Sequence, residues 1–187
     1  GGGVPPDDVF INEFHYDNTG GDTGEFVEIA VAPGFNGALS DISLVFYNGS
    51  GGGIYGSSAT HSLSGFLEGD TTATGHRLFY KTFSDFIQNG APDGFAIVNT
   101  VTSQVLHFIS YEGVMTATNG PAAGMTSINI GVSQNAEVTG QASLGLTGTG
   151  GSAADFTWTK FTGIAHSPGS PNNAQNFILP TLPSQGL

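Results

Sequence analysis

The first feature that could support chemistry is an acidic, glycine-rich stretch near the start of the chain. Five side chains with oxygen ligands fall within twelve residues there: Asp17, Asn18, Asp22, Glu25 and Glu28. Calcium takes about six to eight oxygen ligands, and the interleaved glycines would let the loop curl around an ion. The spacing is not that of an EF-hand. The same residue types are typical of a hairpin turn whose Asx side chains bind their own backbone, so calcium binding and turn formation stay open as two interpretations.

A second candidate is a pair of carboxylates on neighbouring strands, Glu13 and Glu28. A glycosidase-type site needs two acids a few ångströms apart in a cleft, one of them with a raised pKa. Period-two alternation along the strands puts Glu13 on the face of Ile11, and Glu28 on the face opposite Ile29. We therefore expect these carboxylates to join neighbouring strands or accept backbone hydrogen bonds, and not to act as an acid and a base.

The remaining residues give no catalytic pattern. No two of the five histidines lie within ten residues of each other, and none forms a His-x-His or His-Glu-x-x-His sequence. No Gly-x-Ser-x-Gly sequence marks a nucleophilic serine. Trp158 could stack on a sugar, but an aromatic residue on a late strand of a sandwich more often completes the core. The sequence thus predicts a protein that is not an enzyme.

The composition of the chain limits which partners it can bind and where it is expected to be located. The 187 residues include 15 Asp and Glu against three Lys and Arg, a formal net charge of −12. Phosphate-backbone binding relies on Lys and Arg, so nucleic acid is expected to bind only through a bridging divalent cation. Cysteine is absent, which together with the Gly, Ser, Thr and Asn content we interpret as typical of a secreted bacterial surface protein. No run of about 20 apolar residues occurs, so no membrane insertion is expected.

Hydrophobic alternation predicts β-structure along the whole chain. Short runs rich in Val, Ile, Phe and Tyr are separated by glycine-containing turns, the pattern of a sandwich or barrel. The expected strands are Val9–Tyr16, Glu25–Val31, Ile42–Asn48, His76–Lys81, Phe95–Asn99, Val105–Tyr111, Ser127–Val132, Ala142–Leu146 and Phe156–Lys160. Ile128, Ile130 and Val132 should form an inward-facing row, and only residues 83–88 could make a helical turn. We predict an all-β, immunoglobulin-like β-sandwich of about eight or nine strands.

Seven stretches together resemble the lamin tail domain family in its bacterial extracellular branch. In the family's order they are INEFHYDNTGGDTGEFVEI at 11–29, LSDISLVFYNG at 39–49, NGAPDGFAIV at 89–98, FISYEG at 108–113, GPAAG at 120–124, DFTW at 155–158 and SPGSPN at 167–172. The family commonly has Gly-Trp where this chain has Asp41 and Ile42, which replaces a large core aromatic by a smaller aliphatic residue. The resemblance implies an immunoglobulin-like β-sandwich, and in bacteria such domains accompany extracellular nucleases, phosphatases or surface proteins.

The expected organisation is an N-terminal extension at 1–8, a lamin-tail-like sandwich at 9–177 and an apolar, proline-containing tail at 178–187. Prolines keep such a tail extended, and it could add as a strand to the open sheet edge of a neighbouring molecule. A head-to-tail contact of that kind does not close and would build a filament. The expected assembly residues are Phe177, Ile178, Leu179 and Leu182.

The sequence therefore predicts a non-catalytic structural or interaction module, located outside the cell or on its surface. Its expected partners are other copies of itself or another surface protein. Two alternatives remain open. One is an accessory domain that helps a secreted nuclease or phosphatase to engage its substrate or a surface. The other is a calcium-assisted carbohydrate-binding sandwich that uses exposed aromatic residues.

Overall fold

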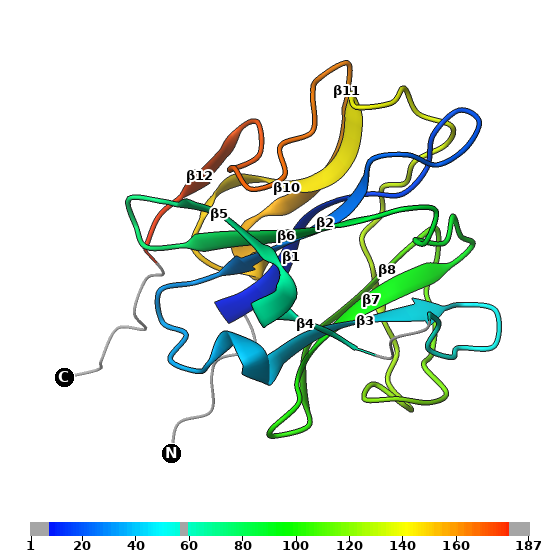
Figure 1. Ribbon diagram of the computed structural model, residues 1–187, viewed down its shortest axis with the longest axis horizontal. Coiled ribbons are helices and arrows are strands. Elements are labelled where there is room, and N and C mark those ends of the chain that lie inside the picture. The colour runs from blue at the N-terminus through cyan, green and yellow to red at the C-terminus, as the bar shows by residue number, and fades with distance from the viewer. Residues whose placement is uncertain (1–7, 57–59, 180–187) are drawn as a thin grey trace.

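The computed structural model describes residues 8–56 and 60–179, and strands dominate both ranges (Figure 1). No α-helix occurs in them. Short 3₁₀ turns join some of the strands: η2 (Leu39–Asp41), η3 (Leu63–Gly65) and η4 (Ala153–Asp155). The strands form two sheets that pack face to face, so the predicted all-β sandwich is confirmed.

The larger sheet has seven strands. Its order is β11 (Thr157–Thr162), β10 (Ala142–Gly150), β1 (Val9–His15), β2 (Glu25–Val31), β6 (Arg77–Phe83) and β5 (Leu67–Thr71), with β12 (Gln175–Phe177) parallel to β10. The smaller sheet has the order β4 (His61–Ser62), β3 (Ile42–Asn48), β7 (Asp93–Asn99), β8 (Gln104–Tyr111) and β9 (Ile128–Asn129). The described strands outnumber the eight or nine expected because β4, β5 and β12 are short or lack apolar alternation.

The main core lies between the sheets and follows the alternation of the sequence. Ile29 of β2 and Leu44 of β3 are both fully buried in it. The inward row expected at 128–132 is only partly right. Ile130 and Val132 pack against this core, but Ile128 is 69% exposed. β9 is a two-residue strand at the edge of its sheet, where little covers its side chains.

Loops cover the outer faces of both sheets and bury two further apolar clusters. On the smaller sheet, the segment after β8 supplies Met115, Ala117 and Ala122, which cover Val45, Tyr47, Ala96, Val98 and Phe108. On the larger sheet, Phe156 and Phe177 cover Phe10, Ala30, Leu78 and Leu146. The C-terminal strand is therefore part of the folded domain.

The helical turn expected at residues 83–88 is absent, because the backbone amides of this segment have another acceptor. β6 runs on to Phe83, and the chain then bends. The amides of Phe86 and Ile87 both donate to the carboxylate of Glu25, at 2.8 and 3.0 Å. A carboxylate that holds two consecutive amides keeps the segment in an irregular conformation.

Candidate functional site

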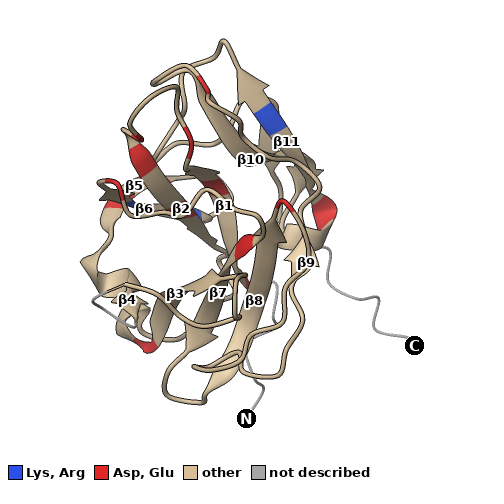
Figure 2. Ribbon diagram, turned by 90° about the vertical axis from the view of Figure 1, so that its right-hand side faces the viewer, with Lys and Arg blue, Asp and Glu red and all other residues tan. Residues whose placement is uncertain are grey.

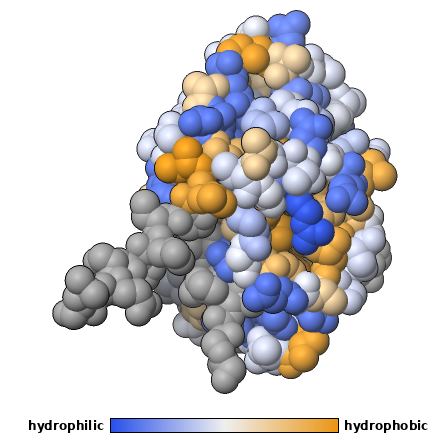
Figure 3. Space-filling view, turned by 90° about the vertical axis from the view of Figure 1, so that its left-hand side faces the viewer, coloured by the Kyte–Doolittle hydropathy of each residue, from blue (hydrophilic) through white to orange (hydrophobic). Residues whose placement is uncertain are grey.

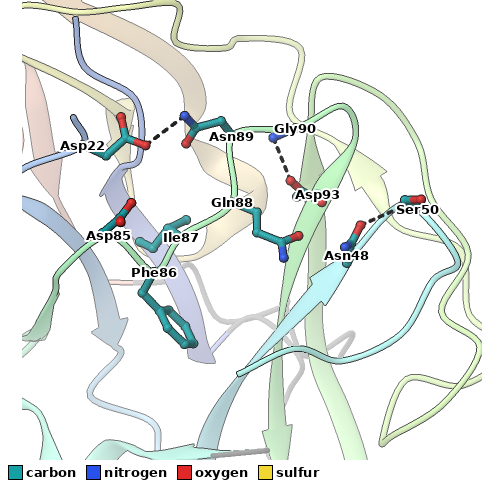
Figure 4. Close-up of a pocket in the computed structure, with 10 residues that line it drawn as sticks. All are labelled: Asp22, Asn48, Ser50, Asp85, Phe86, Ile87, Gln88, Asn89, Gly90 and Asp93. Atoms are coloured by element: carbon teal, nitrogen blue, oxygen red, sulfur yellow. Dashed lines mark hydrogen bonds between the residues drawn. The ribbon is translucent and has the colours of Figure 1, made fainter. Parts of the chain in front are cut away.

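A depression of about 490 Å³ lies where the turn between β1 and β2 meets the loop between β6 and β7. Its lining is mostly polar, with Phe86 and Ile87 as the apolar exceptions, as the close-up in Figure 4 shows: Asp22, Asn48, Ser50, Asp85, Phe86, Ile87, Gln88, Asn89, Gly90 and Asp93. The depression carries three aspartates and none of the three Lys and Arg residues of the chain. It is therefore an electronegative surface with amide groups between the acids.

The turn between β1 and β2 is held by its own Asx side chains. The Oδ1 atom of Asn18 accepts the amide of Thr23 at 2.8 Å and lies 2.9 Å from His15 Nε2. Asp22 Oδ1 accepts the amide of Asn18 at 3.0 Å, and its Oδ2 accepts the side-chain amide of Asn89 at 2.9 Å. The bonds to the amides of Thr23 and Asn18 are those expected of an Asx turn. The bond to Asn89 connects the turn to the loop that lines the depression.

The other three predicted metal ligands point to different places. Asp17 Oδ2 accepts the amide of Ala136 at 3.2 Å. The Glu25 carboxylate is bound to the loop after β6, and Glu28 lies within a separate buried network. Among the described residues, no three or more His, Cys, Asp or Glu side chains are gathered so that they could hold a metal ion. The side chains predicted to bind calcium thus have separate partners within the fold and do not converge on one point: Asp17, Asn18, Asp22, Glu25 and Glu28.

Glu25 binds the backbone of Phe86 and Ile87, two residues that line the depression, and its pKa is perturbed. Burial raises the pKa of the Glu25 carboxyl, and the nearby carboxylates of Asp22 and Asp85 raise it further, against the lowering effect of its two amide donors. A raised pKa of this kind is common at functional sites, but it also arises in structural networks. Here both Glu25 oxygens are used to hold the loop.

Glu13 of β1 and Glu28 of β2 are paired across the two strands and lie on the same face of the sheet. Alternation had predicted that they would lie on different faces. The strands pair Ile11 with Ile29 and then Glu13 with Glu28, so Asn12 is an extra residue in β1. Such a β-bulge shifts the side-chain alternation by one position, which brings both glutamates to the same face. The expectation of opposite faces was wrong because a bulge has no sequence signature as clear as an alternating pattern.

Both glutamates hold the segment that leads to the C-terminal strand. Glu13 accepts the hydroxyl of Ser143 at 2.7 Å, and the amide and hydroxyl of Ser167 at 3.1 and 3.0 Å. Glu28 accepts the side-chain amide of Asn12 at 2.7 Å and the amide of Gly169 at 2.6 Å. The expectation that strand carboxylates join neighbouring elements is therefore confirmed for this pair.

Burial dominates the electrostatics of this pair. It raises the pKa of Glu13, and it raises the pKa of Glu28 well above the usual range with a further contribution from the charge of Glu13. A paired-acid catalyst would need these carboxyls to face a substrate. In this structure their oxygens face serine, asparagine and glycine donors of the chain itself.

Two of the histidines lie close together, which the sequence alone does not show. The rings of His15 and His166 have centroids 5.8 Å apart although 151 positions separate them in the chain. Burial lowers the pKa of His166, and the neighbouring His15 lowers it further. His107 lies elsewhere and is partly buried; its Nδ1 accepts the amide of Ile11 at 3.3 Å, and desolvation lowers its pKa to about 4. His107 and His166 are thus neutral side chains of the fold at neutral pH.

The predicted assembly residues separate into two groups. Phe177 is only 7% exposed, and its ring lies 4.7 Å from His76 and 5.4 Å from Phe156, measured between centroids. The next two residues, Ile178 and Leu179, are 42% and 61% exposed. Phe177 is therefore a core residue of this chain, and the prediction that it is an assembly contact is corrected. Leu182 lies outside the described residues.

None of the 20 aromatic rings of the chain, all of which lie in the described ranges, is exposed. Trp158 is half-buried and packs edge-on against Phe14, with centroids 5.6 Å apart. It therefore belongs to the core, as the sequence favoured. A sugar-stacking surface needs exposed rings, and the described surface offers none.

Comparisons with protein-family models, with curated proteins and with solved structures find no match to this chain. The resemblance to lamin tail domains thus stays a prediction from the sequence. Within residues 8–56 and 60–179, no helix has the length and apolar character needed to cross a bilayer.

Proposed function

We propose that this chain is a non-catalytic structural or interaction module of the bacterial cell exterior, which assembles with copies of itself through its C-terminal segment. The extracellular location is supported by the absence of cysteine together with the content of Gly, Ser, Thr and Asn. The role as a module is supported by the use of the carboxylates. Glu13, Glu25 and Glu28 each hold a loop or strand of the fold in place.

The observation that carries assembly is the way the C-terminal strand ends. Phe177 anchors β12 in the outer cluster of the larger sheet, and the amide of Ile178 still donates to Gly150 at 2.9 Å. Leu179 then projects with 61% of its surface exposed. An anchored strand that leads into exposed apolar residues can present them to a neighbouring molecule at a small cost in entropy.

The contact is expected to involve few residues of the domain itself. Seen from the left of Figure 1, the surface has apolar residues in small separate groups among hydrophilic ones (Figure 3). An added strand suits such a surface, because its affinity comes chiefly from main-chain hydrogen bonds along a sheet edge. This favours strand addition over the docking of two broad apolar faces at this side.

The test is the molar mass measured by light scattering for the full chain and for a chain that lacks residues 179–187. The deletion spares Phe177 and the bond of Ile178, so the described core is kept and the only described residue lost is the exposed Leu179. We expect the mass of the full chain to exceed that of a monomer, and the deletion to lower it. The variant Val101→Ser alters a residue that is 73% exposed in the turn between β7 and β8, outside any edge strand, and should leave the mass unchanged. Equal masses for the full and shortened chains would refute assembly through the tail.

A further inference from the structure

Four asparagines of the chain are followed directly by glycine: Asn36, Asn48, Asn89 and Asn119. Such a pair can lose ammonia spontaneously, because the backbone nitrogen of the glycine can attack the side-chain amide of the asparagine. A residue without a Cβ hinders this attack least. The surroundings of the four pairs differ in whether they hold the attacking nitrogen, hold the asparagine, or leave both without a partner.

The carboxylate of Asp93 binds the attacking nitrogen of two pairs. Its Oδ1 accepts the amide of Gly49 at 3.1 Å, and its Oδ2 accepts the amide of Gly90 at 2.7 Å, the bond drawn in Figure 4. These two amide donors favour the ionised form of Asp93, against the raising of its pKa by burial. Attack requires the glycine nitrogen to lose its proton, and a neighbouring negative charge disfavours the anion that results. The bonds to Asp93 therefore hinder the reaction at Asn48 and at Asn89.

Packing requires glycine at both of these positions. A Cβ on Gly49 would collide with the carbonyl oxygen of Pro92, and a Cβ on Gly90 would collide with the carboxylate of Glu112. Gly90 also has a φ of +97°, where residues with side chains are rarely found. A larger residue after Asn48 or Asn89 would lower the reactivity but does not fit, so the bond to Asp93 is the feature that lowers it.

In the pair at Asn119 it is the asparagine that is held. Its Oδ1 accepts the amide of Ile54 at 2.9 Å, and its backbone carbonyl accepts the hydroxyl of Tyr47 at 3.1 Å. Both bonds restrict the rotation that brings the side-chain amide towards the nitrogen of Gly120.

The pair at Asn36 has neither kind of protection. Asn36 and Gly37 are exposed in the loop between β2 and η2, and neither makes a hydrogen bond within the described part of the chain. Glycine is required here too, since a Cβ on Gly37 would lie 2.8 Å from the ring of Phe35, a member of the main core. The fold thus keeps a reactive pair on the surface without a group that restrains it.

We propose that Asn36 is a site of spontaneous covalent modification, and that Asp93 protects Asn48 and Asn89 from the same reaction. The nitrogen of Gly37 loses its proton and bonds to Cγ of Asn36, and the side-chain amide leaves as ammonia. Water then opens the succinimide at either carbonyl, which yields aspartate or isoaspartate. The product gains a negative charge on a chain whose acidic segments already far outnumber the basic ones (Figure 2). This chemistry does not depend on self-assembly.

The first test compares the folded wild-type protein with the same protein unfolded in urea, at one mildly alkaline pH and one temperature. Peptide mapping by mass spectrometry measures aspartate and isoaspartate at each site, and isoaspartate identifies the succinimide route. The four sites should react at similar rates in urea. Folding should slow Asn48 and Asn89 about tenfold or more, the effect of a neighbouring charge on the population of the anion, and Asn36 should be the fastest site. Equal rates at all four sites of the folded protein, or an Asn36 as slow as Asn48, would overturn the proposal.

The second test removes the protecting carboxylate. In folded Asp93→Ser, ammonia loss at Asn48 and Asn89 should accelerate about tenfold or more, and the rate at Asn36 should stay the same. Asp85→Asn is the matched control, because Asp85 lines the same depression but accepts neither glycine amide. A urea unfolding curve identifies the conditions in which Asp93→Ser is folded, and the wild-type comparison decides alone if there are none. Unchanged rates at Asn48 and Asn89 in the folded variant would refute protection by Asp93.

Discussion

Replacing Phe177 with alanine tests whether the last strand belongs to the fold. The side chain is 7% exposed and packs against His76 and Phe156. Truncating a buried phenylalanine costs about 3–5 kcal/mol of unfolding free energy. We expect the lower end, about 3 kcal/mol, because β12 is a three-residue strand whose neighbours can close partly around the lost ring. For a domain of this size that corresponds to a fall in Tm of about 6–12 °C.

The assay is urea denaturation followed by Trp158 fluorescence, with calorimetry for Tm. Leu179→Ala is the control, because a side chain that is 61% exposed should change the unfolding free energy by no more than about 0.5 kcal/mol. A Phe177→Ala variant as stable as Leu179→Ala would show that the Phe177 ring does not stabilise the fold. It would mean that β12 detaches easily, and Phe177 would again be a candidate for assembly.

Two further predictions concern the carboxylates. Burial raises the pKa of Glu28, so the folded protein binds this proton more tightly than the unfolded chain, and the stability that it contributes falls as pH rises above about 4.5. The slope of unfolding free energy against pH between about 5 and 8 should be shallower in Glu28→Gln than in the wild type. The exposed control Glu68→Gln should keep the slope of the wild type. Equal slopes in all three proteins would contradict this prediction. Millimolar calcium should leave Tm unchanged, because the oxygens of the first turn are occupied by amide donors. A saturable rise in Tm that Asp22→Asn abolishes would show a calcium site instead.

Strands with clear alternation could be predicted from the sequence almost residue by residue. β2 and β3 have the expected bounds, Glu25–Val31 and Ile42–Asn48. Their patterns are strong because branched or aromatic apolar residues recur at every second position, Val27, Ile29 and Val31 in β2 and Ile42, Leu44 and Phe46 in β3. β12 gave no such signal. It has three residues, and its one apolar anchor, Phe177, is buried by segments distant in the chain.

The candidate sites were harder to predict because they depend on backbone detail. The cluster of acids at 17–28 is dense in the sequence, yet Asp17 and Glu25 turn to backbone amides of other loops. The opposite happens at Glu13 and Glu28, which the bulge at Asn12 brings together. Bulges and long-range amide acceptors leave only weak marks in a single sequence. Residue types alone therefore left turn and metal interpretations open at 17–28, and they indicated a joining role for Glu13 and Glu28 without naming Ser167 and Gly169 as partners.

We infer that this chain is a module that assembles with itself. The most direct test is the weight-average mass of the unmodified protein measured by sedimentation equilibrium over a wide range of concentrations at physiological salt. Self-association should give a mass that rises above the 19.1 kDa of the single chain as concentration increases. A mass that stays at 19.1 kDa over the whole range would contradict it.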